Sequence, residues 1–202
     1  MRCDGRFESA LARRGYRAVA GVDEAGRGCL FGPVFAAAVI LPLDLRIDGV
    51  RDSKQLAARR REELAARIQA EATAWAVAEA SAGEIDQINI LQASRLAMRR
   101  AVERLSTPPD FLLVDAIDID LHVPQRGLIK GDARVRSIAA ASILAKVHRD
   151  ACMREWSETY PQYGLARHVG YGTPEHLAAL ERFGPTPQHR ATFEPVRKAA
   201  AC

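Results

Sequence analysis

Two short apolar segments, separated by a glycine-rich loop, constrain the fold of this chain more than any other feature. The first covers residues 16–22, and the second, PVFAAAVIL, covers residues 33–41 and is closed by Pro42. Apolar segments of this length, bounded by glycine or proline, are typical of strands buried on both faces. We therefore predict two neighbouring buried strands joined by the loop at residues 26–32.

The later segments alternate between helical and strand patterns, which favours a layered α/β core. We predict helices at 59–72, 90–105, about 133–159 and 174–182, and further strands at 75–80 and 111–114. The middle of the longest helix is made mostly of small residues, so this helix can lie close against a sheet. Beyond about residue 160 the chain is loop-rich and predicts a small helical appendage.

Composition favours a globular chain that can bind a polyanion. With 48% hydrophobic residues the chain can bury a sizeable core, yet no apolar segment approaches the roughly 20 residues that span a bilayer. No signal-peptide pattern follows the first residues, so we expect a cytoplasmic protein. The net charge of +4 favours a polyanionic partner without proving one. The cysteines, Cys3, Cys29, Cys152 and Cys202, lack metal-binding spacing and are expected to be free thiols.

Acidic residues follow two of the predicted buried strands. Asp23 and Glu24 come directly after the first strand, and Asp115 follows the strand at 111–114. Adjacent carboxylates at a strand end repel each other unless a cation offsets their charge; a solvated strand end is the alternative. In a regular strand the two side chains point to opposite faces, so a shared ion requires a local twist or bulge. Because sites in layered α/β folds form at strand ends, Asp115 favours a joint metal site.

Three further acids have competing explanations. Asp118 and Asp120 are rivals of Asp115 as site residues, although their alternation with the apolar residues of segment 117–121 predicts an ordinary exposed strand face. Asp132 precedes the longest helix, where it could be an N-cap or a catalytic residue. Carboxylates without a histidine or cysteine cluster match oxygen-preferring ions such as Mg²⁺ or Mn²⁺. Two such ions can hydrolyse a phosphodiester without a covalent nucleophile.

The loop after the acid pair exposes its backbone. Gly26, Arg27 and Gly28 offer N–H and C=O groups that glycine side chains do not cover. Together with Gly32 the loop reads GxGxxxG, which is loosely related to the dinucleotide-binding motif. The preceding acids would repel a pyrophosphate, and Pro33 starts a strand instead of a helix, so nucleotide binding is the weaker alternative.

Six segments together closely resemble the bacterial ribonuclease HII family, a type 2 ribonuclease H. They are GVDEAGRGCLFGPV (21–34), DSKQL (52–56), LVDA (113–116), IKGDARVRSIAAASILAKVHRD (129–150), YGLARHVGYGTPEH (163–176) and GPTPQHRATFEP (184–195). These segments occur in the order expected for the family and span nearly the whole chain. The combination of DEAGRG with KGDxxxxSIAAASIxAK is far more specific than a lone glycine motif.

The resemblance implies an RNase H-like mixed five-stranded sheet flanked by helices. Residues 1–160 would form the catalytic core, and residues 161–202 a small C-terminal helical extension that contributes to substrate binding. The implied enzyme is an endoribonuclease that hydrolyses the RNA strand of RNA–DNA hybrids. It would also incise 5′ of single ribonucleotides embedded in duplex DNA. Catalysis would use two Mg²⁺ or Mn²⁺ ions and would leave 3′-hydroxyl and 5′-phosphate ends.

The resemblance also implies which acids bind the ions. Asp23 and Asp115 would be ligands shared by both ions. Glu24 and Asp132 would complete the two ion sites. All four would therefore be catalytic residues.

Further residues would contact the substrate. Residues 26–28 would sense the ribose 2′-hydroxyl, the group that separates RNA from DNA. Tyr171 would pack on the deoxyribose at the RNA–DNA junction, or would only pack within its own glycine-rich loop. Lys54, Lys146 and Arg149 would contact phosphates, unless they are solvated surface charges.

Two residues depart from the pattern that the resemblance predicts. Ala116 stands in place of a glycine and would be strained if its φ is positive. Val169 stands where the resemblance predicts a lysine, so one phosphate contact would be missing. The tail carries no motif for docking on a sliding clamp, and we expect a monomer. The alternatives are another RNase H-like nuclease of the junction-resolvase type, or a non-catalytic nucleic-acid binder.

Overall fold

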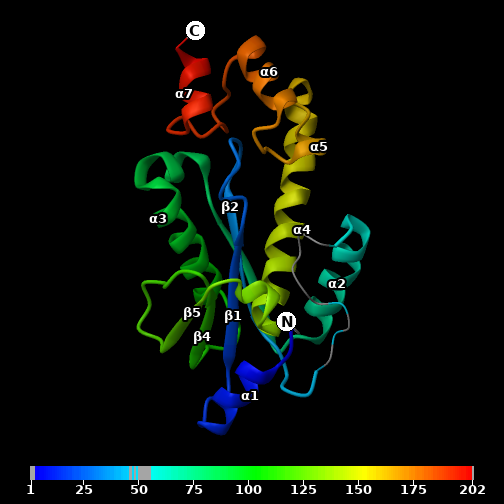
Figure 1. Cartoon of the computed structure of the whole chain (residues 1–202), viewed down its shortest axis with the longest axis vertical. Helices are drawn as coiled ribbons and strands as arrows, with labels where there is room; N and C mark the ends of the chain where they lie inside the picture. Colours follow the sequence, from blue (N-terminus) through cyan, green and yellow to red (C-terminus); the bar gives the residue numbers. More distant parts are fainter. Residues whose placement is uncertain (1–2, 46, 48, 50–55, 202) are drawn as a thin grey trace.

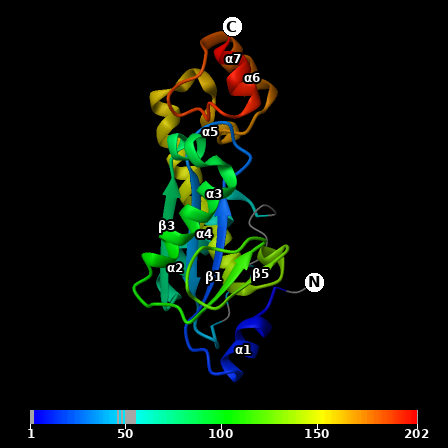
Figure 2. The ribbon, with the colours of Figure 1, turned by 90° about the vertical axis from the view of Figure 1, so that its left-hand side faces the viewer.

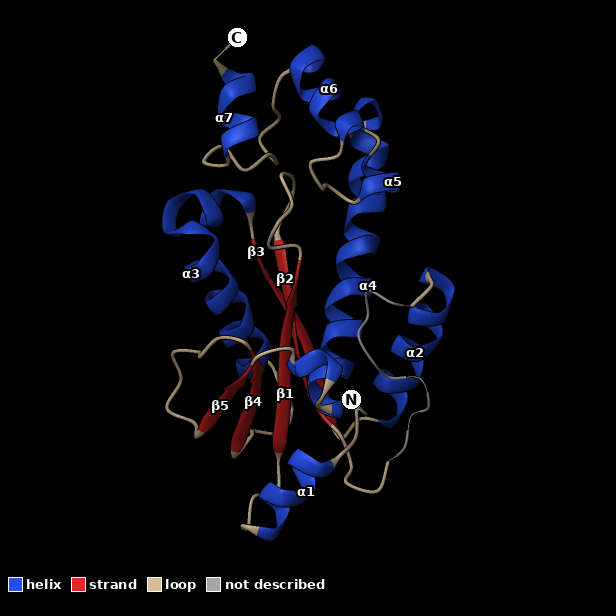
Figure 3. Ribbon diagram, in the orientation of Figure 1, coloured by secondary structure: helices blue, strands red, loops and turns tan. Residues whose placement is uncertain are grey.

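The computed structural model describes residues 3–45, 47, 49 and 56–201, and its centre is a mixed five-stranded sheet (Figure 1). The strands lie in the order β3-β2-β1-β4-β5 (Figure 3). Their bounds are β1 Val19–Ala25, β2 Val34–Ile40, β3 Ala74–Ala80, β4 Phe111–Asp115 and β5 Gln125–Leu128. β2 pairs antiparallel with β1 and β3, whereas β4 pairs parallel with β1 and β5. The predicted mixed five-stranded sheet is confirmed.

Helices cover both faces of the sheet. Their bounds are α1 Arg6–Arg13, α2 Ala58–Glu71, α3 Ala82–Glu103, α4 Arg136–Thr159, α5 Leu165–His168, α6 Pro174–Phe183 and α7 Glu194–Ala200, with 3₁₀ turns η2 Gly131–Ala133 and η3 Pro161–Tyr163. α3 packs on one face, and α4 together with α2 packs on the other (Figure 1). Within the described ranges, no helix has both the length and the apolarity that a bilayer crossing requires.

α4 lies directly against β1 because both contact surfaces are small. A Cβ atom at Gly21 would lie 2.1 Å from the backbone carbonyl carbon of Ser137, so the strand and the helix touch through their main chains. Ala139, Ala140 and Ala141 are fully buried in the same layer. This close packing explains why the middle of the helix consists of small residues.

The C-terminal extension, defined here as residues 161–201, lies at one end of the sheet (Figures 1 and 2). Its buried side chains include Tyr163 and Val196. The same hydrophobic cluster contains Phe31 from the loop between β1 and β2, and Met153 from α4. The extension therefore shares its core with the loop that follows the acid pair.

The predicted strand face at residues 117–121 is wrong, because the structure has a loop there. The Gln125 carboxamide accepts a hydrogen bond from the Ile119 N–H at 2.8 Å and donates one to the Ile119 carbonyl at 2.7 Å. These two bonds satisfy both backbone polar groups of Ile119 without a partner strand. The edge strand β5 was not predicted, because its sequence, QRGL, shows no apolar alternation.

Two helix starts also differ from the predicted ones. α3 begins at Ala82 instead of residue 90, behind a capping box formed by Ser81 and Glu84, and is broken at Asn89, where φ is 66°. α4 begins at Arg136, and the preceding residues 131–133 form a separate 3₁₀ turn. Because α4 starts later than predicted, Asp132 lies in that turn and not at the N-terminus of the helix.

Candidate active site

The parallel pairing of β1 with β4 brings two of the predicted acids together. Val22 pairs with Val114, so Asp23 and Asp115 follow on adjacent strands at the same edge of the sheet. Glu24 lies next to them along β1. A cavity of about 230 Å³ opens here, and its lining residues are Asp23, Glu24, Ala25, Gly26, Arg27, Gly28, Asp115, Ser142, Lys146 and Tyr171.

The carboxylates of this cavity lie close together and repel one another, and burial makes their ionisation still less favourable. Asp23 is only 4% exposed, and burial, with the charges of Glu24 and Asp115, raises its pKa well above the usual range. The Ser142 hydroxyl and the backbone N–H of Glu24, at 2.7 Å, donate to the Asp23 carboxylate. These two hydrogen bonds lower the pKa of Asp23, but burial dominates. A cation in the cavity would offset the repulsion.

Glu24 has one satisfied and one unsatisfied carboxylate oxygen. Its Oε1 accepts a hydrogen bond from Nη1 of Arg27 at 3.2 Å. Its Oε2 is buried and has no hydrogen-bond partner in the described structure. Burial raises the pKa of Glu24, and Arg27 opposes that rise. A buried carboxylate oxygen without a donor fits a hard cation as its missing partner.

Asp115 and Asp132 are linked through the backbone of the 3₁₀ turn. The N–H of Gly131 donates to Oδ1 of Asp115 at 2.6 Å, which joins the turn to the end of β4. Asp132 is buried in that turn and is not part of the cavity lining. The N-cap of α4 is Val135, so the N-cap explanation for Asp132 is wrong. In the ranges that the structure describes, no three potential ligand side chains already converge on one ion position.

The predicted substrate residues fall into three groups. Residues 26–28 and Tyr171 line the same cavity as the acids, and the Tyr171 side chain is partly exposed. Lys146 also lines it, with Nζ bonded to Asp150 at 2.7 Å and 5.9 Å from the centre of the Tyr171 ring. Arg149 does not fit a phosphate contact, because it is fully buried. Lys54 lies outside the described residues.

The Arg149 guanidinium instead donates hydrogen bonds to backbone carbonyls inside the protein. Nη1 donates to the carbonyl of Val169 at 2.8 Å, and Nη2 donates to the carbonyl of Phe31 at 3.2 Å. These acceptors lie in the extension and in the loop after the acid pair. Arg149 therefore fixes the two segments that carry the predicted substrate residues, and its predicted direct contact with phosphate is replaced by this structural role.

Both departures from the family pattern have left-handed backbone. Ala116 has φ 59°, so the predicted strain is present directly after Asp115. Val169 has φ 42°, which is less favourable still for a β-branched residue. Each position is one that glycine, or at Val169 an unbranched residue, would occupy at lower cost.

Ser142 is a site residue that the sequence reasoning missed. It donates to Asp23 and lies four residues before Lys146 on α4. Residues four apart share one face of a helix, so this spacing is the signal that could have identified it.

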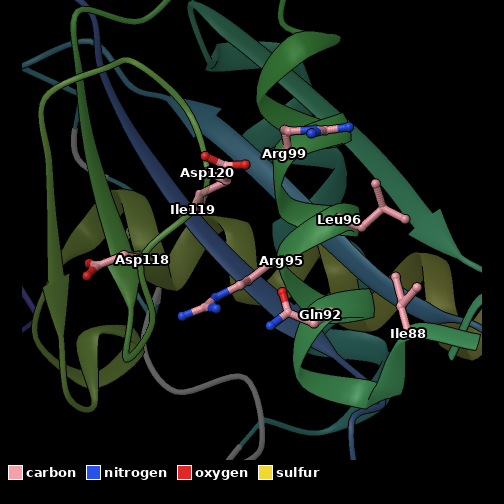
Figure 4. Close-up of a pocket in the computed structure, with 8 residues that line it drawn as sticks. All are labelled: Ile88, Gln92, Arg95, Leu96, Arg99, Asp118, Ile119 and Asp120. Atoms are coloured by element: carbon pink, nitrogen blue, oxygen red, sulfur yellow. The ribbon is translucent and has the colours of Figure 1, made fainter.

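A second cavity lies between α3 and the loop after β4 (Figure 4). Arg95 and Arg99 of α3 line one side, and Asp118 and Asp120 line the other. These two aspartates are absent from the lining of the carboxylate cavity. They therefore do not replace Asp115 in the acid set.

Comparison with known proteins adds evidence from outside the chain. A family model described as ribonuclease HII matches residues 20–196. A ribonuclease HII of Solibacter usitatus (strain Ellin6076) is 62% identical over 98% of this chain and 86% of its own length. That of Enterococcus faecalis (strain ATCC 700802 / V583) is 53% identical over 95% of this chain and 75% of its own length.

Solved structures show the same fold. The ribonuclease H2 from Pyrococcus horikoshii OT3 superposes with a TM-score of 0.77 and 28% identity, covering 92% of this chain and 98% of that chain. Bst-RNase HIII in complex with Mn²⁺ superposes with a TM-score of 0.68 and 21% identity, covering 91% of this chain and 69% of that chain. The predicted RNase H-like fold is thereby confirmed.

Proposed function

Because the chain belongs to the ribonuclease HII family and is therefore a metal-dependent ribonuclease H, we propose that it also incises duplex DNA 5′ of single embedded ribonucleotides. Family membership implies cleavage of the RNA in RNA–DNA hybrids. It also argues against the two alternative functions, a non-catalytic nucleic-acid binder and a junction resolvase. The proposed incision would leave a 3′-hydroxyl and a 5′-phosphate.

One observation carries the proposal: a single cavity holds both the acids and the groups suited to reading one sugar. Asp23, Glu24 and Asp115 line it together with residues 26–28 and Tyr171. A scissile phosphate beside the acids would place the adjoining ribose against the glycine-rich backbone. Because these groups lie within one small cavity, recognition would need only one ribonucleotide, not a long RNA strand.

The donor set supports Mg²⁺ or Mn²⁺ as the cofactor. Asp23, Glu24 and Asp115 supply carboxylate oxygens. Among these oxygens, Oε2 of Glu24 has no hydrogen-bond partner and could coordinate an ion directly. Asp132, in the turn bonded to Asp115, would complete the set when the carboxylates close around the ions. Two bound ions would supply activation of the attacking water and stabilisation of the leaving oxygen.

The chain's own residues would bind and orient the substrate. Ser142 holds the Asp23 carboxylate in place by hydrogen bonding. Arg27 holds the carboxylate of Glu24, and Lys146 lies at the cavity wall, where its charge would attract a phosphate. Tyr171 presents an exposed ring on which the deoxyribose after the junction would pack. In this proposal the extension would contribute to substrate binding through Tyr171.

Cleavage of three duplexes tests the proposal: one with a single ribonucleotide, one full hybrid and one all-DNA duplex, each with Mg²⁺ and with Mn²⁺. We expect 5′ incision at the ribonucleotide, cleavage of the hybrid and no cleavage of all-DNA. The proposal would be wrong if only the hybrid were cut, or if the all-DNA duplex were cut as fast as the duplex with the ribonucleotide.

A further inference from the structure

Two segments of the extension hold the loop that follows the acid pair. The N–H of Leu30 donates to the carbonyl of Gly170 at 2.8 Å, and the N–H of Gly32 donates to the carbonyl of Gln188 at 2.8 Å. The N–H of Arg190 donates back to the carbonyl of Leu30 at 2.9 Å. The position of the glycine-rich loop is therefore set by two segments that lie 140 to 160 residues away in sequence.

The side chain of Arg190 makes the closest connection to the sugar-sensing residues. It is fully buried, and its Nη2 donates to the carbonyl of Gly26 at 2.8 Å. Its Nη1 donates to the carbonyl of Arg27 at 2.8 Å, and its Nε donates to the carbonyl of Gly32 at 3.0 Å. One planar guanidinium thus binds three carbonyls of a single loop.

These bonds determine where the loop's N–H groups point. In a trans peptide the C=O and the following N–H point in opposite directions. With the carbonyls of Gly26 and Arg27 turned toward Arg190, the N–H groups of Arg27 and Gly28 are turned away from it. Within the described structure neither N–H group has an internal acceptor. A Cβ atom at Gly28 would meet nothing within 4 Å, so the loop faces open space there.

We propose that Arg190 is a positioning residue for ribonucleotide recognition: it fixes two peptide groups so that the N–H groups of Arg27 and Gly28 face the substrate. The inference rests on the proposed function, in which this loop reads the sugar. The ligand chemistry is an oxygen acceptor, either the ribose 2′-oxygen or an adjoining phosphate oxygen. Both donors are oriented before the substrate arrives, so binding does not have to reorganise the loop.

The number of acceptors explains why this position requires arginine. Three carbonyls in fixed directions match the rigid fork of a guanidinium, whereas an ammonium group cannot reach all three in one geometry. Arg190→Lys keeps the charge and much of the volume but loses this fork. The variant therefore tests peptide orientation with little change in electrostatics.

The experiment compares Arg190→Lys with the wild type and with Arg136→Lys as a matched control. Arg136 is also a buried guanidinium that donates to backbone carbonyls, those of Pro42, Leu43 and Leu45, but it lies outside the cavity lining. For each protein, kcat/KM is measured on the single-ribonucleotide duplex with Mg²⁺. The Kd for the all-DNA duplex is measured by fluorescence anisotropy in EDTA, and folding is checked by thermal denaturation.

We expect Arg190→Lys to lose roughly tenfold or more in kcat/KM, while its Kd for all-DNA stays within about twofold of wild type. Arg136→Lys should lower Tm and keep kcat/KM. In ¹H–¹⁵N spectra of Arg190→Lys, the amide signals of Arg27 and Gly28 should shift, and guanidinium ions should partly restore the activity of Arg190→Ala.

Three outcomes bear against the proposal and are distinguishable. Wild-type kcat/KM in Arg190→Lys, with unshifted Arg27 and Gly28 amides, would overturn the positioning role alone. An equal loss in Arg136→Lys would show that general destabilisation is the cause. A wild-type protein that does not cut the ribonucleotide duplex would overturn the proposed function, and the inference with it.

Discussion

The Arg149 guanidinium lies against the backbone of Gly26 so closely that a Cβ atom there would be 2.0 Å from Nε of Arg149. Gly28, two residues further on, has open space where its Cβ would be. Two glycines of one motif therefore have different reasons to be glycine. The first allows the protein to pack, and the second leaves room in the cavity.

Gly26→Ala should therefore damage the fold around the loop. The substitution places a methyl group against Arg149 at a residue with φ 94°, which disfavours any side chain. We expect a loss of roughly 2 kcal/mol or more in the free energy of unfolding. Denaturant titration measures it, and unchanged stability would contradict the packing described here.

Gly28→Ala is the matched substitution, and it should impair substrate binding without reducing stability. Because the new methyl group meets no protein atom, Tm should stay close to wild type. The methyl group would extend into the cavity, so KM for the single-ribonucleotide duplex should rise at least tenfold (about 1.4 kcal/mol). Loss of stability with normal KM would refute this assignment.

Asp23→Asn should abolish cleavage and stabilise the free protein. Burial and the neighbouring carboxylates raise the pKa of Asp23, so the folded state resists its ionisation more than the unfolded state does. Such a group stabilises the fold below its unfolded pKa and loses that contribution as pH rises through its folded pKa. At neutral pH the neutral amide should therefore gain on the order of 1 kcal/mol.

Thermal denaturation with and without Mg²⁺ measures this effect. Mg²⁺ should raise the Tm of the wild type more than that of Asp23→Asn, because the variant has lost a ligand. Asp118→Asn is the control, since Asp118 lies outside the carboxylate cavity. Wild-type cleavage by Asp23→Asn would remove this residue from the active site.

Val169→Lys should strengthen substrate binding. Lysine lacks the branched Cβ that makes φ 42° costly at this position, and it adds a cation beside Gly170 and Tyr171. The slope of log Kd against log salt concentration should steepen by about 1. Val169→Gln separates the loss of the branched Cβ from the added charge: it should leave the slope unchanged.

Acid should destabilise the extension through a buried histidine pair. Nδ1 of His176 donates to the carbonyl of Tyr171 at 3.0 Å, and the N–H of Thr186 donates to Nδ1 of His189 at 2.9 Å. His189 Nε2–H therefore donates to Nε2 of His176, 3.1 Å away, and both rings are neutral. Burial lowers the pKa of His176 and lowers that of His189 to about 3.

In the unfolded state both histidines bind protons near pH 6.5, whereas in the folded state the pair binds protons only at lower pH. The stabilising contribution of this pair is therefore present above pH 6.5 and is lost as pH falls toward about 3. The Tm difference between wild type and His189→Gln should shrink between pH 7.5 and pH 5. A difference that did not depend on pH would contradict the neutral pair.

The sequence predicted what local pattern encodes. Asp115 ends one apolar strand and Asp23 lies near the end of another, and these two strands define the edge of the sheet where both acids lie. β5 was missed because an edge strand of four residues needs no apolar face. Arg149 was misread because α4 alone does not show that two distant loops cover that helix face. Arg190 carries no local signal, since its acceptors are more than 150 residues away.

α4 is one uninterrupted helix of 24 residues that belongs to both halves of the molecule. Ser142 lies at the acids, and Met153 lies in the cluster that contains the extension's side chains. A single residue inserted between them would rotate everything beyond it by about 100° and advance it by about 1.5 Å. Tyr171 would then leave the cavity. Insertions and deletions in descendants of this gene should therefore accumulate in surface loops such as 117–124 and spare this helical segment.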